Sequence, residues 1–269
     1  MTGAPTPPVA PPVPAYRRRG RWEHVATRSY GTTVHRVVPD SGPALYVKAT
    51  TSADETDPRF HPVAEAAALR WLRERGFPVA RVVEVGRDDE WSWLVTEELP
   101  GVPASGPWRA DQVDAVLDAV AGVAAALHRL PVARCPFDRR LAVTLPACRR
   151  AVELGTVDLD DLDERHEGWT GAQLLAELAA TPVPPEDLVV CHGDLGLDNV
   201  LLDPDTLAPT GLLDAGRLGV ADRWTDLSIL LRDLAEAGWC DPAGFTARYG
   251  LSDVDSAKDS FYRLMDEFI

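Results

Sequence analysis

One segment of the chain, CHGDLGLDNVLL at residues 191–202, carries several side chains that could take part in chemistry. Asp194 and Asn199 lie five positions apart on a polar stretch between two apolar runs, and Asp214 ends a later apolar run. Phosphoryl transfer from a nucleotide needs a carboxylate that accepts the proton of the attacking hydroxyl, and oxygen ligands for Mg²⁺. The spacing makes Asp194 a candidate catalytic base and Asn199 and Asp214 candidate magnesium ligands.

Two neighbouring polar residues have simpler interpretations. We expect His192 to order the loop by hydrogen bonding, and Asp198 to be a solvated or loop-capping carboxylate. Asp194, Asn199 and Asp214 could also be loop caps without a chemical role. We set this alternative aside, because three spacings that all suit one reaction are hard to obtain by chance.

The elements that must position these residues fall into two parts. Residues 1–20 are a proline-rich tail, and residues 21–98 are mostly strand with one helix. Apolar and polar residues alternate along the expected strands, and a Gly ends the helix. These elements are strands at 32–38, 44–50, 79–86 and 91–99, and a helix at 62–76.

The segment PGVPASGP at 100–107 is rich in Pro and Gly and is the candidate boundary between two lobes, the second of which covers residues 99–269. The second lobe is mainly helical, and its first helix has Val113, Val116, Val120, Val123 and Leu127 on one face. Helices are expected at 110–130, 145–154, 170–180, 224–238 and 256–269, and short strands at 188–192, 199–203 and 210–214. The whole chain is thus predicted to be α+β.

Composition restricts the class of partner. The 269 residues include 42 acids and 27 bases, for a net charge of −15. This excess of acids argues against nucleic acid or an anionic membrane surface, and it suits a cationic ligand or simple solubility. The four scattered cysteines indicate reduced thiols, and neither a spanning segment nor a secretory signal is apparent. We expect a cytoplasmic monomer.

The pattern H-x-D-x-x-x-x-N followed by D-x-G is that of the protein kinases, with Gly193 where those enzymes carry Arg. From Trp22 onward the chain resembles the aminoglycoside O-phosphotransferases through LYVK, WLVTEELPGVPA, ALHRLPVARCPFDRRL, HGDLGLDN, DAGR and FYRLMDEFI. The CPF and DEF-type segments are similar to the 3′/3″ group. The resemblance implies a bilobal protein-kinase-like fold, and ATP-dependent, or GTP-dependent, phosphorylation of an aminoglycoside with Mg²⁺. The acceptor would be the 3′-hydroxyl of a kanamycin or neomycin type, or the 3″-hydroxyl of streptomycin, and the result antibiotic resistance.

The resemblance also assigns residues to the nucleotide. It implies that Lys48 contacts the α- and β-phosphates and that Glu65 holds Lys48 in place. Asp226 resembles the residue that supports the catalytic loop. The phosphate-covering turn and the interlobe hinge that contacts adenine would involve Ser29, Gly31, Thr96 and Glu98.

The acceptor side is implied by acidic residues. Six acids fall in DLDDLDERHE at residues 158–167, and the chain ends on an Asp-Glu pair and the α-carboxylate of Ile269. An aminoglycoside carries several ammonium groups, so converging carboxylates would recognise it. The expected substrate-binding residues are Asp163, Glu164, Glu167, Arg217, Asp266, Glu267 and Ile269.

Three alternatives share part of this pattern. A protein kinase would share the catalytic residues, but no A-P-E sequence or activation segment follows Asp214. Choline, fructosamine or sugar kinases share the same residues and use cationic or sugar acceptors. A non-catalytic kinase-like binding module should lack the base or a metal ligand, whereas Lys48, Asp194, Asn199 and Asp214 are all present.

Overall fold

The computed structural model describes residues 20–28, 31–51 and 61–268. The chain divides into two compact units. The first comprises residues 1–70 and 80–98, and the second comprises residues 71–79 and 99–269. Ser29 and Ile269, which the sequence suggested as binding residues, lie outside the described residues.

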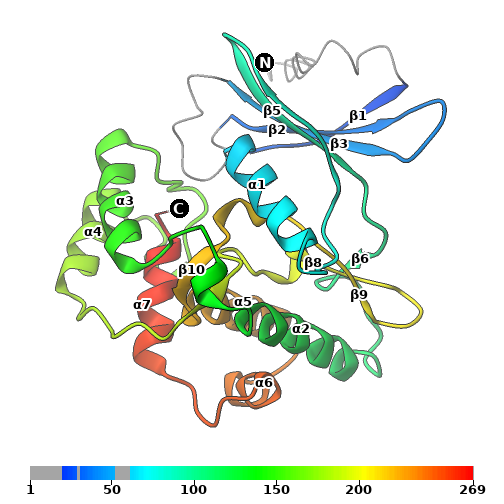
Figure 1. Cartoon of the computed structure of the whole chain (residues 1–269). Coiled ribbons are helices and arrows are strands. Elements are labelled where there is room, and N and C mark those ends of the chain that lie inside the picture. The colour runs from blue at the N-terminus through cyan, green and yellow to red at the C-terminus, as the bar shows by residue number, and fades with distance from the viewer. Residues whose placement is uncertain (1–19, 29–30, 52–60, 269) are drawn as a thin grey trace, which may run out of the picture. The chain divides into compact units, whose positions relative to one another are not determined.

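The first unit is built on a five-stranded antiparallel sheet in the order β1-β2-β3-β5-β4, accompanied by helix α1 (Figure 1). Val37, Val47 and Val95 are fully buried in its core. Lys48 lies between Val47 and Ala49, and strand alternation directs its side chain to the opposite face from theirs. The elements are β1 (Arg21–Thr27), β2 (Thr33–Val38), β3 (Leu45–Thr51), α1 (Pro62–Arg73), β4 (Val82–Arg87) and β5 (Trp91–Glu97).

The second unit is mainly helical. Helix α2 packs against α6, and α5 packs against α7. The face of α2 expected from the sequence is confirmed at Val116, Val120, Val123 and Leu127, which are all buried. The helices are α2 (Val113–His128), α3 (Leu141–Leu154), α4 (Gly171–Ala180), α5 (Trp224–Ala237), α6 (Pro242–Tyr249) and α7 (Ser256–Asp266), with short 3₁₀ turns η2 (Val132–Arg134), η3 (Glu164–His166), η4 (Leu197–Asn199) and η5 (Ala215–Arg217).

Short strands of the second unit carry the polar loops. They form an antiparallel pair, β10-β7, and a three-stranded antiparallel sheet, β6-β8-β9. Their bounds are β6 (Val102–Pro103), β7 (Leu188–Cys191), β8 (Val200–Leu202), β9 (Pro209–Leu212) and β10 (Gly219–Asp222). The loop with Asp194 thus leaves one small sheet at β7 and enters the other at β8.

The α+β class is confirmed, and two helices differ from expectation. Helix α3 begins at Leu141 rather than near 145, with Pro146 inside it. The Leu141 amide donates to Glu186 Oε1 at 2.9 Å, so a side chain distant in sequence caps this helix. Helix α6 was not expected from the sequence, although Asp241 caps it and Pro242 is its first residue.

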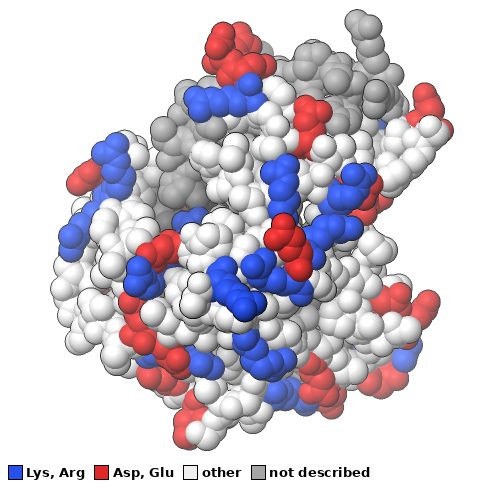
Figure 2. All heavy atoms as spheres, viewed as in Figure 1, with Lys and Arg blue, Asp and Glu red and all other residues white. Residues whose placement is uncertain are grey.

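Charged side chains of both signs are interspersed on the face drawn in Figure 2, and the excess of acids forms no continuous patch there. None of the helices in the described part of the chain is both long and apolar enough to cross a membrane.

Candidate active site

The loop that holds Asp194 has a backbone conformation that only glycine adopts easily. Gly193 has φ +87°, and a Cβ atom there would lie 2.4 Å from the Arg217 carbonyl oxygen. A side chain at position 193 would therefore combine backbone strain with a steric clash. Glycine at position 193 therefore suits this backbone.

Asp226 supports this loop, as expected. It lies in the first turn of α5 and is fully buried. Its carboxylate accepts hydrogen bonds from the amides of His192 at 2.8 Å and Gly193 at 2.7 Å, and a third bond joins it to His128 Nε2 at 2.9 Å. Three bonds to a buried carboxylate fix the backbone immediately before Asp194.

Asp233 holds the other half of the loop. Its Oδ2 accepts the Leu197 amide at 2.8 Å, and it lies 2.9 Å from where a Cβ of Gly196 would be. Burial raises the pKa of Asp233, whereas the Leu197 amide and the neighbouring Arg232 oppose that shift. The sequence analysis did not identify Asp233, since nothing in its local pattern marks it as a loop partner.

Asn199 and Asp194 are joined on one turn. The Asn199 amide nitrogen Nδ2 donates to the Asp194 carbonyl at 2.8 Å and to Asp194 Oδ2 at 3.3 Å. Both donor contacts use Nδ2, which leaves the amide oxygen Oδ1 as the acceptor end of the side chain. An amide oxygen beside a carboxylate fits the ligand preference of Mg²⁺.

Asp214 is held near the same loop by backbone contacts. It has φ +54° and ψ +45°, an uncommon left-handed conformation for a residue other than Gly. His192 Nε2 lies 2.8 Å from the Leu213 carbonyl, and Arg139 Nη2 donates to the Gly216 carbonyl at 3.0 Å. The expected ordering role of His192 is therefore confirmed, because it ties the segment of Asp194 to that of Asp214.

Arg217 links Asp194 to the end of α7. Its Nη1 lies 3.8 Å from Asp194 Oδ1 and 3.2 Å from Asp266 Oδ1. Arg232 Nη1 holds the other oxygen of Asp266 at 2.8 Å. Asp266 thus reaches the neighbourhood of Asp194 through Arg217, and Arg232, which was not expected from the sequence, holds Asp266 from the other side.

The structure gives Glu267 an internal role. Its side chain is 4% exposed, and it accepts hydrogen bonds from the Asp163 amide at 3.2 Å and pairs with His166 Nδ1 at 2.7 Å. Asp163 in turn pairs with Arg165. Glu267 therefore anchors the acidic segment, whereas Glu164 and Glu167 are exposed on it. This contact could not be read from two positions 104 residues apart.

In the first unit, the expected lysine–glutamate pair is present. Lys48 Nζ donates to Glu65 Oε1 at 3.0 Å and to Oε2 at 3.3 Å, and Glu65 is 4% exposed. Gly31 has φ +83°. This pair is the arrangement that the resemblance implied for a nucleotide-binding lysine.

The expected hinge contacts need a correction at Glu98. The Glu98 amide donates to the Ala44 carbonyl at 2.9 Å, so this donor is used inside the first unit. Its carboxylate forms a two-point pair with Arg36, at 2.7 and 2.9 Å, which lowers the pKa of Glu98 despite its partial burial. Thr96 lies on β5 and is paired with Tyr46 on the neighbouring strand β3. The pairing of β5 with its neighbours continues past Glu97, and it removes the Glu98 amide from the set of possible adenine contacts.

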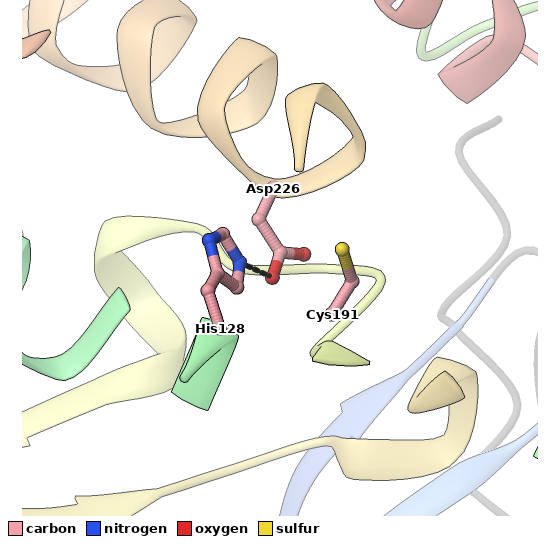
Figure 3. A group of neighbouring side chains, drawn as sticks. All are labelled: His128, Cys191 and Asp226. Carbon is pink, nitrogen blue, oxygen red and sulfur yellow. Dashed lines mark hydrogen bonds and ion pairs between the residues drawn. The ribbon is translucent and has the colours of Figure 1, made fainter. Parts of the chain in front are cut away.

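A cluster of His128, Cys191 and Asp226 resembles a metal-ligand set by residue type (Figure 3). The hydrogen bonds argue otherwise. His128 and Asp226 are bonded to each other, and the Cys191 thiol lies 3.2 Å from the Asp222 carbonyl. Burial raises the pKa of Cys191 well above its usual range, and the thiolate that metals prefer is disfavoured. The cluster instead holds the backbone that precedes Asp194, through the bonds of Asp226 to the His192 and Gly193 amides.

Comparisons with known proteins identify the family of the chain. The model of the family described as "Phosphotransferase enzyme family" matches residues 29–261. An aminoglycoside 3′-phosphotransferase of Streptomyces fradiae is 49% identical over 92% of this chain and 94% of that protein.

Two solved structures share the fold. The crystal structure of an aminoglycoside-3′-phosphotransferase of type VIII superposes with a TM-score of 0.84, at 48% identity over 94% of this chain and 95% of that one. An aminoglycoside phosphotransferase of the 3″ type from Streptomyces rimosus, solved with ADP and streptomycin, has a TM-score of 0.76, at 31% identity over 92% of each chain. The kinase-like architecture expected from the sequence is thereby confirmed, and the chain belongs to the phosphotransferase enzyme family, in its aminoglycoside 3′/3″-phosphotransferase group.

Proposed function

We propose that this protein transfers the γ-phosphoryl group of ATP to the 3′-hydroxyl of a kanamycin- or neomycin-type aminoglycoside and so confers resistance. The observation that carries the proposal is the turn on which Asn199 bonds to Asp194, because it joins a carboxylate base and an amide oxygen in one rigid unit. The 3′ position is favoured over the 3″ position of streptomycin by the higher identity to the solved 3′ enzyme, 48% against 31% for the solved 3″ enzyme.

Asp194 is the catalytic base of the proposed reaction. Its carboxylate accepts the proton of the acceptor hydroxyl while that oxygen bonds to the γ-phosphorus, and the bond from phosphorus to the β–γ bridging oxygen breaks to release ADP. The Asp194 side chain is 37% exposed, so an acceptor can approach it from solvent. Arg217, 3.8 Å away, supplies a positive charge beside it.

The nucleotide side rests on Lys48 and on the metal ligands. Lys48, oriented by Glu65, would bind the α- and β-phosphates. Asn199 and Asp214 would hold Mg²⁺, which when bound neutralises the phosphate oxygens. ATP is the proposed donor, and GTP is the alternative.

The acceptor side rests on carboxylates around the end of α7. Asp266 lies beside Arg217 and Arg232, and Glu164 and Glu167 are exposed on the segment that Glu267 anchors. Carboxylates at these positions would attract the ammonium groups of an aminoglycoside. Asp163 and Asp266 each pair with arginine, so their charge is partly offset, and Glu164 and Glu167 would supply most of the attraction.

A coupled ADP-release assay tests the proposal. Purified protein with ATP and Mg²⁺ should turn over kanamycin and neomycin, with weaker turnover of streptomycin and none of choline. Product analysis by NMR should place the phosphate on the 3′ oxygen. Turnover of choline alone would assign the protein to another small-molecule kinase class, and the absence of turnover with every acceptor would support a binding module.

A further inference from the structure

A continuous chain of hydrogen bonds leads from the end of α6 to the catalytic loop. Tyr249, the last residue of α6, has its hydroxyl 2.7 Å from His128 Nδ1 at the end of α2. His128 Nε2 lies 2.9 Å from Asp226 Oδ2 (Figure 3). Asp226 then binds the amides of His192 and Gly193. Three helices of the second unit are thus joined to the backbone that precedes Asp194.

The donors along this chain can be assigned by elimination. Arg223 Nη1 lies 2.9 Å from the Tyr249 oxygen, and a guanidinium can only donate. The Tyr249 oxygen therefore accepts from Arg223, and the Asp226 carboxylate can only accept, so His128 carries a proton on Nε2 and donates it to Asp226. In the neutral imidazole Nδ1 is then the acceptor, and the Tyr249 hydroxyl donates its proton to Nδ1. Every group is satisfied in this one arrangement.

The three side chains of this hydrogen-bonded chain are buried, so water cannot replace a lost donor. Relative exposure is 0% for Asp226, 7% for His128 and 8% for Tyr249. Burial raises the pKa of Tyr249, so its hydroxyl keeps the proton that it donates. A buried carboxylate that loses one of its donors is poorly compensated, and the amides it binds become free to shift.

We propose that Tyr249 and His128 are positioning residues for Asp194, acting through the tautomer of His128 and the carboxylate of Asp226. The Tyr249 hydroxyl selects the tautomer that donates to Asp226. The third donor keeps the carboxylate oriented toward the amides of His192 and Gly193. The proposal rests on the proposed function in one respect, because the effect of each substitution on kcat is measured as phosphoryl transfer.

The test compares two buried tyrosines, of which only Tyr249 has a hydroxyl that bonds to His128. Tyr249→Phe removes the hydroxyl that bonds to His128. Tyr262→Phe is the matched control, because Tyr262 is also buried, at 5% exposure, and its hydroxyl has no hydrogen-bond partner among the described residues. Tyr249→Phe should lower kcat about three- to tenfold, the factor that corresponds to one hydrogen bond, with KM unchanged for both substrates. Tyr262→Phe should leave kcat unchanged.

His128→Gln supplies a second comparison. Its side-chain amide nitrogen can donate to Asp226 as Nε2 does, but that donor no longer depends on Tyr249. In the His128→Gln background, Tyr249→Phe should therefore cause no further loss of kcat. An equal loss in both backgrounds would overturn the proposed route through His128.

Amide hydrogen exchange provides a readout independent of turnover. The amides of His192 and Gly193 should exchange faster in Tyr249→Phe than in the unaltered protein or in Tyr262→Phe. Equal exchange in all three proteins would overturn the positioning role. If the unaltered protein turned over no acceptor, the proposed function would fail, whereas the exchange result would still decide whether Tyr249 orders the loop.

Discussion

At the scale of single residues, the assignments around Asp194 differ in how far the structure constrains them. Asp194 shares a turn with Asn199 and lies beside Arg217, whereas Asp198, four positions later, accepts a hydrogen bond from Ser105. Two carboxylates of one short loop thus have different surroundings, and each serves as a control for the other.

We expect Asp194→Asn to lower kcat by about 10²–10⁴-fold, the usual contribution of a general base. Nucleotide affinity should be unchanged, since the base acts on the acceptor hydroxyl. Steady-state kinetics and calorimetric titration with ADP would measure the two effects. Asp198→Asn should change kcat little, and a retained kcat in Asp194→Asn would remove Asp194 from the base role.

The metal assignments predict a different signature. Asp214→Ala should abolish the dependence of ADP binding on magnesium, and Asn199→Ala should raise the magnesium concentration needed for half-maximal activity, because each removes one oxygen ligand. Calorimetry of ADP with and without Mg²⁺ measures the first effect. Asp203→Ala is a suitable control, because Asp203 is used in a turn with Thr206. Unchanged Mg²⁺-dependent binding in both variants would contradict the assignment.

At the scale of elements, the loop that holds Asp194 depends chiefly on helix α5. Asp226 and Asp233 on α5 hold its two halves, and His192 ties it to the residue before Asp214. The loop is therefore rigid because of packed helices, and its own sequence contributes mainly Gly193.

Gly193→Ala should lower both stability and kcat. The added Cβ would meet the Arg217 carbonyl at 2.4 Å, and φ +87° is unfavourable for alanine. We expect a loss of at least about 1 kcal/mol in the free energy of unfolding, measured by urea denaturation. The control is Gly122→Ala in α2, where a Cβ meets no heavy atom within 4 Å, and this change should stabilise the helix by about 1 kcal/mol. A Gly193→Ala protein as stable and as active as the original would show that the loop can relax.

The end of α7 is better tested by one substitution than by truncation. Phe268 is buried at 2% exposure and Glu267 anchors residues 163–166, so deleting the last residues would disrupt the core. Asp266→Asn should raise the aminoglycoside KM about two- to fivefold with the ATP KM unchanged, because it removes one carboxylate from the acceptor side. Asp259→Asn is the control, since Asp259 on the same helix pairs with Arg263. Equal KM values in both variants would exclude Asp266 from acceptor binding.

At the scale of the whole molecule, the net charge of −15 makes a prediction about association. A polycationic acceptor should be attracted at low ionic strength, and salt should screen that attraction. Raising salt from about 0.1 to about 1 M shortens the Debye length from ~10 to ~3 Å. The aminoglycoside KM should therefore rise more than the KM of ATP over this range. A salt-independent aminoglycoside KM would indicate that the acids contribute only solubility.

Much of this architecture was predictable because it follows from local patterns of apolar and polar residues. Alternating residues predicted the strand that contains Lys48, and the 3.6-residue period predicted α2 with its buried valines. The spacing of Asp194, Asn199 and Asp214 indicated the chemistry, because the reaction requires those residue types together.

What the tertiary structure alone decided are the contacts between positions far apart in the chain. His128 meets Asp226 across 98 residues and Tyr249 across 121, and Glu267 meets His166 across 101. Glu186 caps α3, and the Glu98 amide is taken by Ala44. No local period encodes such pairs, since a buried polar group is satisfied by whichever partner the packing of helices brings within hydrogen-bond distance. The sequence therefore determined which residues could perform phosphoryl transfer, and the packing determined which residues hold them in place.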